Sequence, residues 1–248
     1  MIGTSAGATA AVQIAGRAPA DLLADILENP VPPARPGAGP TLTSDHLDRF
    51  RELIAASSDA DDMRRRVGEA ALVRDSEDDG SRSLRWRETV AARFPNRAWP
   101  KTPTLLTAID ARTGEPLILD RDSGYDVVDA VAASTSGGLS HHVGEARLLD
   151  GGYRRNENAD LALGYGRVLV LSPLGGRTLH PLAWRMHLAA QVEDLEDEGS
   201  QVATVVPDDA SLAAMGDNLM DFSTRPATAR AGYEQGRGAA RHLKPFWR

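Results

Sequence analysis

The first seven residues hold the pattern that most constrains how this chain can fold. They include Gly3-Thr4-Ser5-Ala6-Gly7, a Gly-x-Ser-x-Gly arrangement that is followed by small, helix-compatible residues. In a nucleophile elbow with this pattern, a strand turns abruptly into a helix and leaves the serine at the tip in a strained backbone conformation. We therefore expect a strand that ends near Gly3 and a helix that begins after Ser5 and packs on a sheet.

Two chemical expectations follow from an elbow at these residues. A Cβ atom at Gly3 or Gly7 would collide with the tight turn, so both positions are expected to require glycine. The helix would point free N–H groups, beginning with that of Ala6, and the positive end of its dipole at Ser5, where they can hold an oxyanion. Taken alone, the five residues also fit a flexible, glycine-rich N-terminus.

Bulk properties exclude several classes of protein. The chain has 248 residues, which suits one large domain or two small ones, and 42% of them are apolar, enough for a sizeable core. The net charge of −7 argues against nucleic-acid binding and against strong electrostatic attraction to anionic membranes. The absence of cysteine excludes disulfides, a cysteine nucleophile and thiolate metal sites. No signal-peptide pattern or membrane-spanning apolar run is visible, so we expect a soluble, cytoplasmic protein.

The apolar pattern predicts helices in the first part of the chain and alternating strands and helices in the rest. Helices are predicted near 21–28, 44–56, 59–71, 84–94, 126–136 and 181–198, and over much of the last fifty residues. Strands are predicted at 145–149, 167–171 and 201–206, with a hairpin over 104–119. Five prolines between 30 and 40 predict a loop, a plain connector or part of a lid. The pattern favours a single α/β domain over 1–248, with a layered, mostly parallel sheet flanked by helices.

A second pattern, Asp150-Gly151-Gly152, follows one of these predicted strands. A serine hydroxyl needs a base, and a carboxylate can accept its proton when it is held directly against the hydroxyl. Asp150 is expected at the end of a strand, where sheet enzymes place working side chains. Gly151 and Gly152 would let the chain turn sharply and bring Asp150 close to Ser5. The same residues also fit an ordinary Asp-Gly turn.

The two patterns together resemble the bacterial patatin-like phospholipases, which use a Ser–Asp dyad built from Gly-x-Ser-x-Gly and Asp-Gly-Gly or Asp-Gly-Ala. Residues 106–115 look like the family's mid-domain hairpin, 129–134 like the helix before the dyad aspartate, and 149–160 like the region around and after it. The resemblance implies a patatin-like fold, Ser5 as the nucleophile and Asp150 as the general base. It further implies lipid acyl-ester substrates, met as dispersed monomers or in transient contact with a membrane surface, and no metal or organic cofactor.

The chain departs from the family pattern in two places. The family begins some tens of residues before the nucleophile, with a strand and a glycine-rich loop that supplies oxyanion donors. Here Gly3 is the third residue, so we interpret the chain as an N-terminally truncated version that keeps the Ala6 N–H and its neighbours as donors. Residues 135–142 replace a more apolar, proline-containing stretch near the acyl pocket, which leaves the acyl preference open.

A catalytic triad is the alternative enzyme hypothesis. The order Ser5, Asp150 and then a histidine is that of the α/β-hydrolases, and three histidines follow Asp150, namely His180, His187 and His242. The first two fall in or beside a predicted amphipathic helix, where a surface or packing role is the simpler interpretation.

A non-enzymatic hypothesis is that the truncated chain keeps a lipid-binding or interaction surface without turnover.

The adjacent His141 and His142 have no other clustered ligands in the sequence, so a solvated loop is expected there rather than a metal site. The basic residues Arg237, Arg241, Lys244 and Arg248 invite contact with phospholipid headgroups, although a solvent-facing stripe at the end of a helix is the simpler account.

Overall fold

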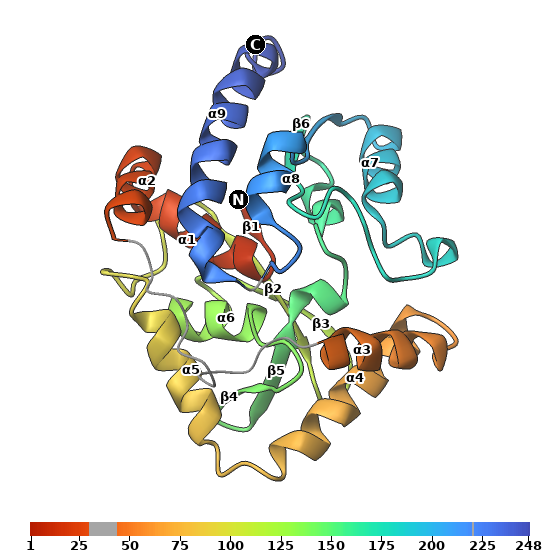
Figure 1. The fold of residues 1–248 in the computed structure, drawn as a ribbon. Helices are drawn as coiled ribbons and strands as arrows, with labels where there is room; N and C mark the ends of the chain where they lie inside the picture. Colours follow the sequence, from red (N-terminus) through yellow and green to blue (C-terminus); the bar gives the residue numbers. More distant parts are fainter. Residues whose placement is uncertain (30–43, 220) are drawn as a thin grey trace.

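The computed structural model describes residues 1–29, 44–219 and 221–248 (Figure 1). The loop predicted over 30–40 lies outside the described residues. The α-helices, in chain order, are α1 (Ala6–Gly16), α2 (Pro19–Glu28), α3 (Ser44–Ala55), α4 (Ala60–Asp75), α5 (Ser81–Ala91), α6 (Val127–Ser134), α7 (Leu188–Asp197), α8 (Asp209–Met215) and α9 (Arg225–Leu243). Short 3-10 helices are η1 (Gly151–Tyr153), η2 (Ala159–Ala162), η3 (Leu182–Trp184) and η4 (Phe222–Thr224). The strands are β1 (Ile2–Gly3), β2 (Leu105–Asp110), β3 (Pro116–Leu119), β4 (His141–Val143), β5 (Ala146–Asp150), β6 (Arg167–Leu171) and β7 (Gln201–Val205).

Strand β2 is the centre of a five-stranded sheet. Along one edge it pairs with β3, and the Asp110 N–H donates to the Glu115 carbonyl on that side. Backbone N–H groups of a strand point to alternate edges, so those of Leu105 and Ala111 point to the other edge. There they donate to the carbonyls of Met1, before β1, and of Arg147, in β5. Strands β1 and β5 therefore share one edge of β2, and β4 pairs with the outer edge of β5.

The directions of the strands differ in part from those predicted. The hairpin predicted over 104–119 is confirmed by the β2–β3 pairing. The prediction of a mostly parallel sheet is not confirmed, because only β1 runs parallel to β2 in this sheet and the other three pairings are antiparallel. Short turns join β2 to β3 and β4 to β5, and parallel neighbours would need a crossover of a dozen or more residues. The apolar run at 167–171 does pair in parallel, with β7 in a separate two-stranded sheet.

Helices cover both faces of the five-stranded sheet, so the predicted layered α/β arrangement is confirmed. On one face, α6 is buried along almost its whole length and packs with α1, α5 and the side chains of Leu106 and Leu148. On the other face, α3 and α4 pack on Ile109 and Leu149 (Figure 1). Neighbouring residues of β2 and β5 thus point to opposite cores, as the alternation of side chains along a strand requires.

The helix predicted over 181–198 is divided in the structure. Its first part is the 3-10 helix η3, and α7 begins only at Leu188. Arg185 lies between them at φ 51°, a left-handed conformation that ends a helical run, and its guanidinium pairs with Glu193 and Asp194 on α7. Among the described residues, no helix combines the length and the apolar character that crossing a membrane demands.

Candidate functional site

The ends of β1 and β5 meet on one edge of β2. Strand β1 runs parallel to β2 and ends at Gly3, whereas β5 runs antiparallel to β2 and ends at Asp150. The two strands therefore approach each other from opposite directions. Gly3 pairs with Leu106 and Asp150 pairs with Ala108, so only Thr107 of β2 lies between the two pairs. This register brings Ser5, which follows β1, into contact with Asp150.

Ser5 has the backbone conformation that an elbow requires. It lies between β1 and α1 at φ 52° and ψ −123°, a left-handed value of φ that non-glycine residues rarely adopt. Such strain costs on the order of 1–3 kcal/mol and persists only where the surroundings hold it. The Ser5 N–H donates to the Ser134 Oγ at 3.1 Å, which provides part of that support. The predicted strand–serine–helix arrangement is confirmed.

The glycines of the two motifs differ in what they permit. A Cβ on Gly3 would lie 2.7 Å from the Ala8 Cα, and one on Gly151 would lie 2.0 Å from the Thr107 Oγ1, so neither site accepts a side chain without rearrangement. A Cβ on Gly7 would meet no atom within 4 Å, and Gly7 has no positive φ. The prediction that Gly7 is needed by the turn is therefore wrong: this second residue of α1 has an ordinary conformation and faces open space.

The Asp150 carboxylate is held by a small number of polar contacts. Its Oδ1 accepts the Gly152 N–H at 2.7 Å, and the Ser5 side chain lies close enough to the carboxylate to favour its ionised form. Burial raises the pKa of Asp150 from 3.8 to about 6, against the opposing effect of these two neighbours. A Cβ on Gly152 would lie 3.1 Å from the same Oδ1, so this glycine leaves room for the carboxylate. A carboxylate with this pKa is ionised at neutral pH and more basic than an exposed aspartate, as suits a general base.

Asn158 ties the two motif loops together. It is fully buried and adopts a left-handed conformation at φ 50° and ψ 36°. Its Nδ2 lies 2.9 Å from the Thr4 Oγ1 and 3.1 Å from the Gly151 carbonyl, and the Thr107 Oγ1 donates to the same Thr4 hydroxyl at 3.0 Å. We did not predict this role. Its one signal in the sequence is that Asn158 falls within the stretch after Asp150 that resembles the patatin-like family.

The C-terminal end of α6 also contacts both loops. Ser134 is fully buried and its Oγ accepts the Ser5 N–H, and the Ser136 carbonyl accepts the Asp150 N–H at 2.9 Å. Neither serine is a predicted site residue. The only hint in the sequence is that polar residues follow directly after an apolar helix, at a position where α6 leaves the core.

A single backbone donor at the start of α1 is available for an oxyanion. The N–H groups of Gly7 and Ala8 donate to the carbonyls of Thr4 and Ser5, at 2.8 and 2.9 Å, and that of Ser5 is bonded to Ser134. The Ala6 N–H has no acceptor in the described part of the chain. The donor expected at Ala6 is therefore present, while its neighbours are already engaged.

The three histidines of the triad hypothesis lie in other environments. His180 is buried against the rings of Phe50 and Trp184, and burial lowers its pKa to about 4. His187 precedes α7, and His242 is exposed on α9. Within residues 1–29, 44–219 and 221–248, no hydrogen bond joins any of these three rings to the Ser–Asp pair, so the geometry does not form a triad.

His141 is not part of a solvated loop, contrary to the prediction. It is 1% exposed, with its Nδ1 3.0 Å from the Ser83 Oγ and its Nε2 2.8 Å from the Asp129 Oδ1. Burial opposes ionisation of Asp129, but hydrogen bonds from His141 and Arg87 hold its pKa below the usual value. This chain of contacts joins α5, α6 and β4. The described residues contain no cluster of side chains that could hold a metal ion.

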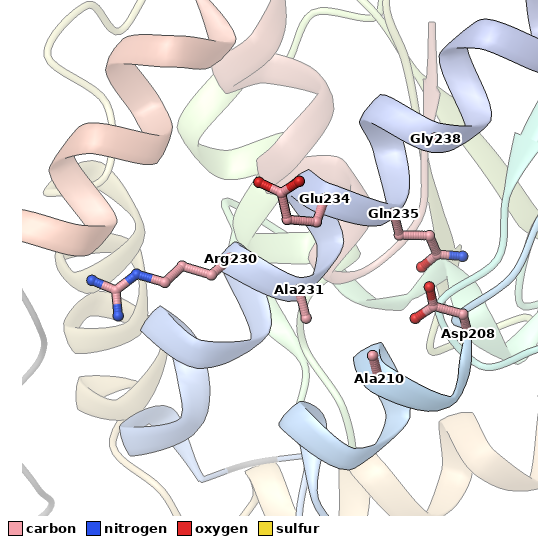
Figure 2. Close-up of a pocket in the computed structure, with 7 residues that line it drawn as sticks. All are labelled: Asp208, Ala210, Arg230, Ala231, Glu234, Gln235 and Gly238. Atoms are coloured by element: carbon pink, nitrogen blue, oxygen red, sulfur yellow. The ribbon is translucent and has the colours of Figure 1, made fainter.

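Two cavities lie away from the Ser–Asp pair. One of about 550 Å³ opens between α8 and α9 and is lined by Asp208, Ala210, Arg230, Ala231, Glu234, Gln235 and Gly238 (Figure 2). Another of about 440 Å³ lies where α4 leads into α5, beside His142 and Arg147. Neither is lined by Ser5 or Asp150. These cavities therefore give no information about the substrate of the pair.

A comparison of the sequence with models of known protein families gave no match, and a comparison with curated proteins gave none either. The chemistry of the site must therefore be argued from its own residues. Its distinguishing features are a strained serine at a strand–helix junction, a half-buried carboxylate beside that serine, and a free backbone donor at the start of α1.

Proposed function

We propose that this protein is a serine acyl-ester hydrolase in which Ser5 and Asp150 form a catalytic dyad like that of the patatin-like phospholipases. The observation that carries the proposal is the placement of the Ser5 side chain against the half-buried Asp150 carboxylate at the tip of a strained elbow. Lipid acyl esters are the proposed substrate class, on the resemblance of the two motifs and the stretches around them to that family.

In the proposed reaction, Asp150 serves first as a base and then as an acid. The carboxylate accepts the Ser5 hydroxyl proton while the Oγ attacks the ester carbonyl carbon, and the Ala6 N–H stabilises the oxyanion of the tetrahedral intermediate. Collapse of the intermediate expels the alcohol, which takes the proton from Asp150, and leaves an acyl group on Ser5. A water molecule then attacks the acyl carbon as Asp150 accepts its proton, and the released Ser5 oxygen recovers that proton.

The local geometry supports this division of roles. The strain at Ser5 and its N–H bond to Ser134 fix the hydroxyl toward Asp150, so little reorganisation is needed at the moment of attack. The oxyanion site is the least complete part of the proposed machinery. Loss of one oxyanion donor costs about 2.7–4 kcal/mol of transition-state stabilisation. With the Ala6 N–H as the one donor that residues 5–8 leave free, slow turnover is expected.

Labelling with a fluorophosphonate probe tests the proposal directly. The parent protein should be labelled at Ser5, as located by mass spectrometry of the modified peptide, and Ser5→Ala should not be labelled. Asp150→Asn should be labelled far more slowly, because the amide cannot accept the hydroxyl proton. Ser83→Ala is a control, because Ser83 is a buried serine whose hydroxyl contacts His141 and the His142 N–H rather than Asp150, and its labelling should equal that of the parent.

The same samples should then be assayed for hydrolysis of short and long acyl esters. His180→Ala should keep its activity if a dyad operates, and loss of activity in a folded variant would favour the triad. A folded parent protein that is neither labelled nor active would refute the hydrolase proposal. It would favour the second candidate, a binding module without turnover, to which the single free oxyanion donor at Ala6 gives some weight.

A further inference from the structure

Helix α9 contacts the helices α8 and α2. The Thr228 Oγ1 donates to the Ala214 carbonyl at 3.1 Å, and the Gln235 Nε2 donates to the Val206 carbonyl at 2.6 Å. Thr228 and Gln235 are seven residues apart, almost two full turns, so both lie on the same side of the helix. This side packs on α8, and α9 also contacts α2.

The opposite side of α9 carries a stripe of positive charge. We call Arg230, Arg237, Arg241 and Lys244 the basic stripe. Arg230 and Arg237 follow the two anchoring residues by two positions, about 200° around the helix, and the other two continue the same line at helical spacing. All four are exposed, and Figure 2 shows Arg230 extending away from the contact between α9 and α8.

The charge of this segment is opposite to that of the whole chain. Residues 225–248 contain six Arg and Lys side chains and one Glu, a net charge of +5, whereas the chain carries −7. The helix has 19 residues, and its C-terminal end extends beyond the other elements (Figure 1). Because charges are screened over about 8 Å at physiological ionic strength, the end of such a helix, about 28 Å long, presents its own charge rather than that of the acidic body.

Exposed aromatic rings accompany the basic stripe. Tyr233 is 50% exposed and lies on the same side as Arg237, whose guanidinium sits 5.9 Å from the ring centre. Trp247 is 54% exposed just after the helix and packs edge-on against Phe246. Tyrosine and tryptophan are the side chains that settle at the boundary between lipid headgroups and acyl chains.

We propose that the basic stripe and Trp247 dock α9 on an anionic lipid surface. This inference rests on the proposed function. A hydrolase of lipid esters meets its substrate more often when it is held at the lipid layer that contains it. The helix would lie along the headgroups, with cationic side chains on the phosphates and the two aromatic rings at the interface. Its far side keeps the hydrogen bonds to α8, so docking needs no unfolding of the body.

The other polyanion that a basic helix can meet is a nucleic acid. The aromatic residues do not separate the two partners by themselves, since they can also stack on bases. The net negative charge of the rest of the protein favours a membrane as the partner. A membrane surface contacts only the side of the protein that carries the basic stripe, whereas a nucleic acid bound there would extend beyond the four cations and be repelled by acidic surfaces. Binding to nucleic acid is therefore an outcome that would contradict the proposal.

The test is flotation of the Ser5→Ala protein with vesicles, so that turnover does not alter the lipids. Vesicles of phosphatidylcholine alone are compared with an equimolar mixture of phosphatidylcholine and phosphatidylserine, at low and high NaCl. The protein should bind the anionic vesicles and be released by salt. Each cation near such a surface contributes about five-fold in binding, so the variant with Arg230→Gln, Arg237→Gln and Arg241→Gln should bind roughly 100-fold more weakly.

A matched control carries the same loss of charge elsewhere, with Arg49→Gln, Arg85→Gln and Arg97→Gln at exposed positions, and should bind like its parent. Trp247→Ala should weaken binding without changing its dependence on salt. Equal binding by the stripe variant and the control, or tighter binding of Ser5→Ala to duplex DNA than to vesicles, would overturn the proposal.

Fluorophosphonate labelling of the stripe variant, made with Ser5 intact, separates this inference from the proposed function. Labelling equal to that of the parent together with lost vesicle binding supports both proposals. Vesicle binding by a parent protein that is not labelled would support the docking surface and contradict the hydrolase. Labelling of a parent protein that does not bind vesicles would support the hydrolase and contradict the docking surface.

Discussion

Replacement of Asp150 by asparagine should stabilise the folded protein at neutral and alkaline pH. The pKa of Asp150 is raised by burial from 3.8 to about 6. As pH rises through that interval, the unfolded chain gives up the proton while the folded protein keeps it, so the free energy of unfolding falls. The difference of 2.2 pKa units corresponds to about 3 kcal/mol, which is lost by about pH 6 and stays lost above it.

Asparagine does not titrate, and its Oδ1 can still accept the Gly152 N–H. The variant and the parent should therefore differ little near about pH 4, whereas at about pH 8 the variant should be more stable by about 3 kcal/mol. Urea denaturation of both proteins across this range measures the difference directly, and other titrating groups cancel because both proteins share them. A difference in stability that does not change with pH would refute the argument that burial raises this pKa.

The same pKa should govern catalysis. Asp150 can accept the Ser5 proton only in its ionised form, so kcat/KM for an ester should rise with pH and level off above about pH 6. A profile that rises near neutrality but follows a histidine pKa, and that is lost in His180→Ala, would point to a different base. The ionised carboxylate that lowers stability is thus the form that the proposed reaction needs, a trade-off common at catalytic sites.

Three further predictions concern the framework of the site. Gly151→Ala should destabilise the protein by about 1–3 kcal/mol or more in urea denaturation, because the new Cβ would lie 2.0 Å from the Thr107 Oγ1. Gly7→Ala places a methyl group into open space on α1, so the same measurement should show unchanged stability or a gain of up to about 1 kcal/mol. Asn158→Ala should cost about 1–3 kcal/mol and slow fluorophosphonate labelling of the elbow serine more than Gly7→Ala does. His141→Ala should cost a similar amount, about 1–3 kcal/mol, yet preserve labelling of the folded fraction, since its contacts do not reach the dyad.

Local patterns in the sequence were enough to predict the elbow and the end of β5. The order of glycines around Ser5 predicts a strand, a strained residue and a helix, and the short apolar run before Asp150 predicts a strand end. Both predictions depend on neighbours in the sequence only. That these two ends meet was expected from the resemblance to the patatin-like family and not from a local pattern. The meeting depends on the register of β1 and β5 on β2, with Thr107 between them, and no local pattern encodes a register between strands a hundred residues apart.

The supporting contacts were missed for the same physical reason. Asn158 holds Thr4 across 154 positions of the chain, and Ser134 holds Ser5 across 129, so each is visible only once the chain is folded. The mistaken expectation for Gly7 has another origin. A motif states which residues occur together, whereas the need for a glycine depends on what surrounds its missing side chain, and around Gly7 there is open space.

The arrangement on β2 gives a physical reason why the proposed dyad would need no histidine beside Asp150. A histidine in a triad carries the proton between a serine and a carboxylate that do not touch. Here one edge of one strand aligns the ends of two others, so that serine and carboxylate meet directly, and burial supplies the basicity that an exposed aspartate lacks. The contact between the two side chains therefore depends on the register of three strands. Gly151→Ala alters neither reacting group, yet it should abolish labelling of Ser5 in the fraction of the protein that remains folded.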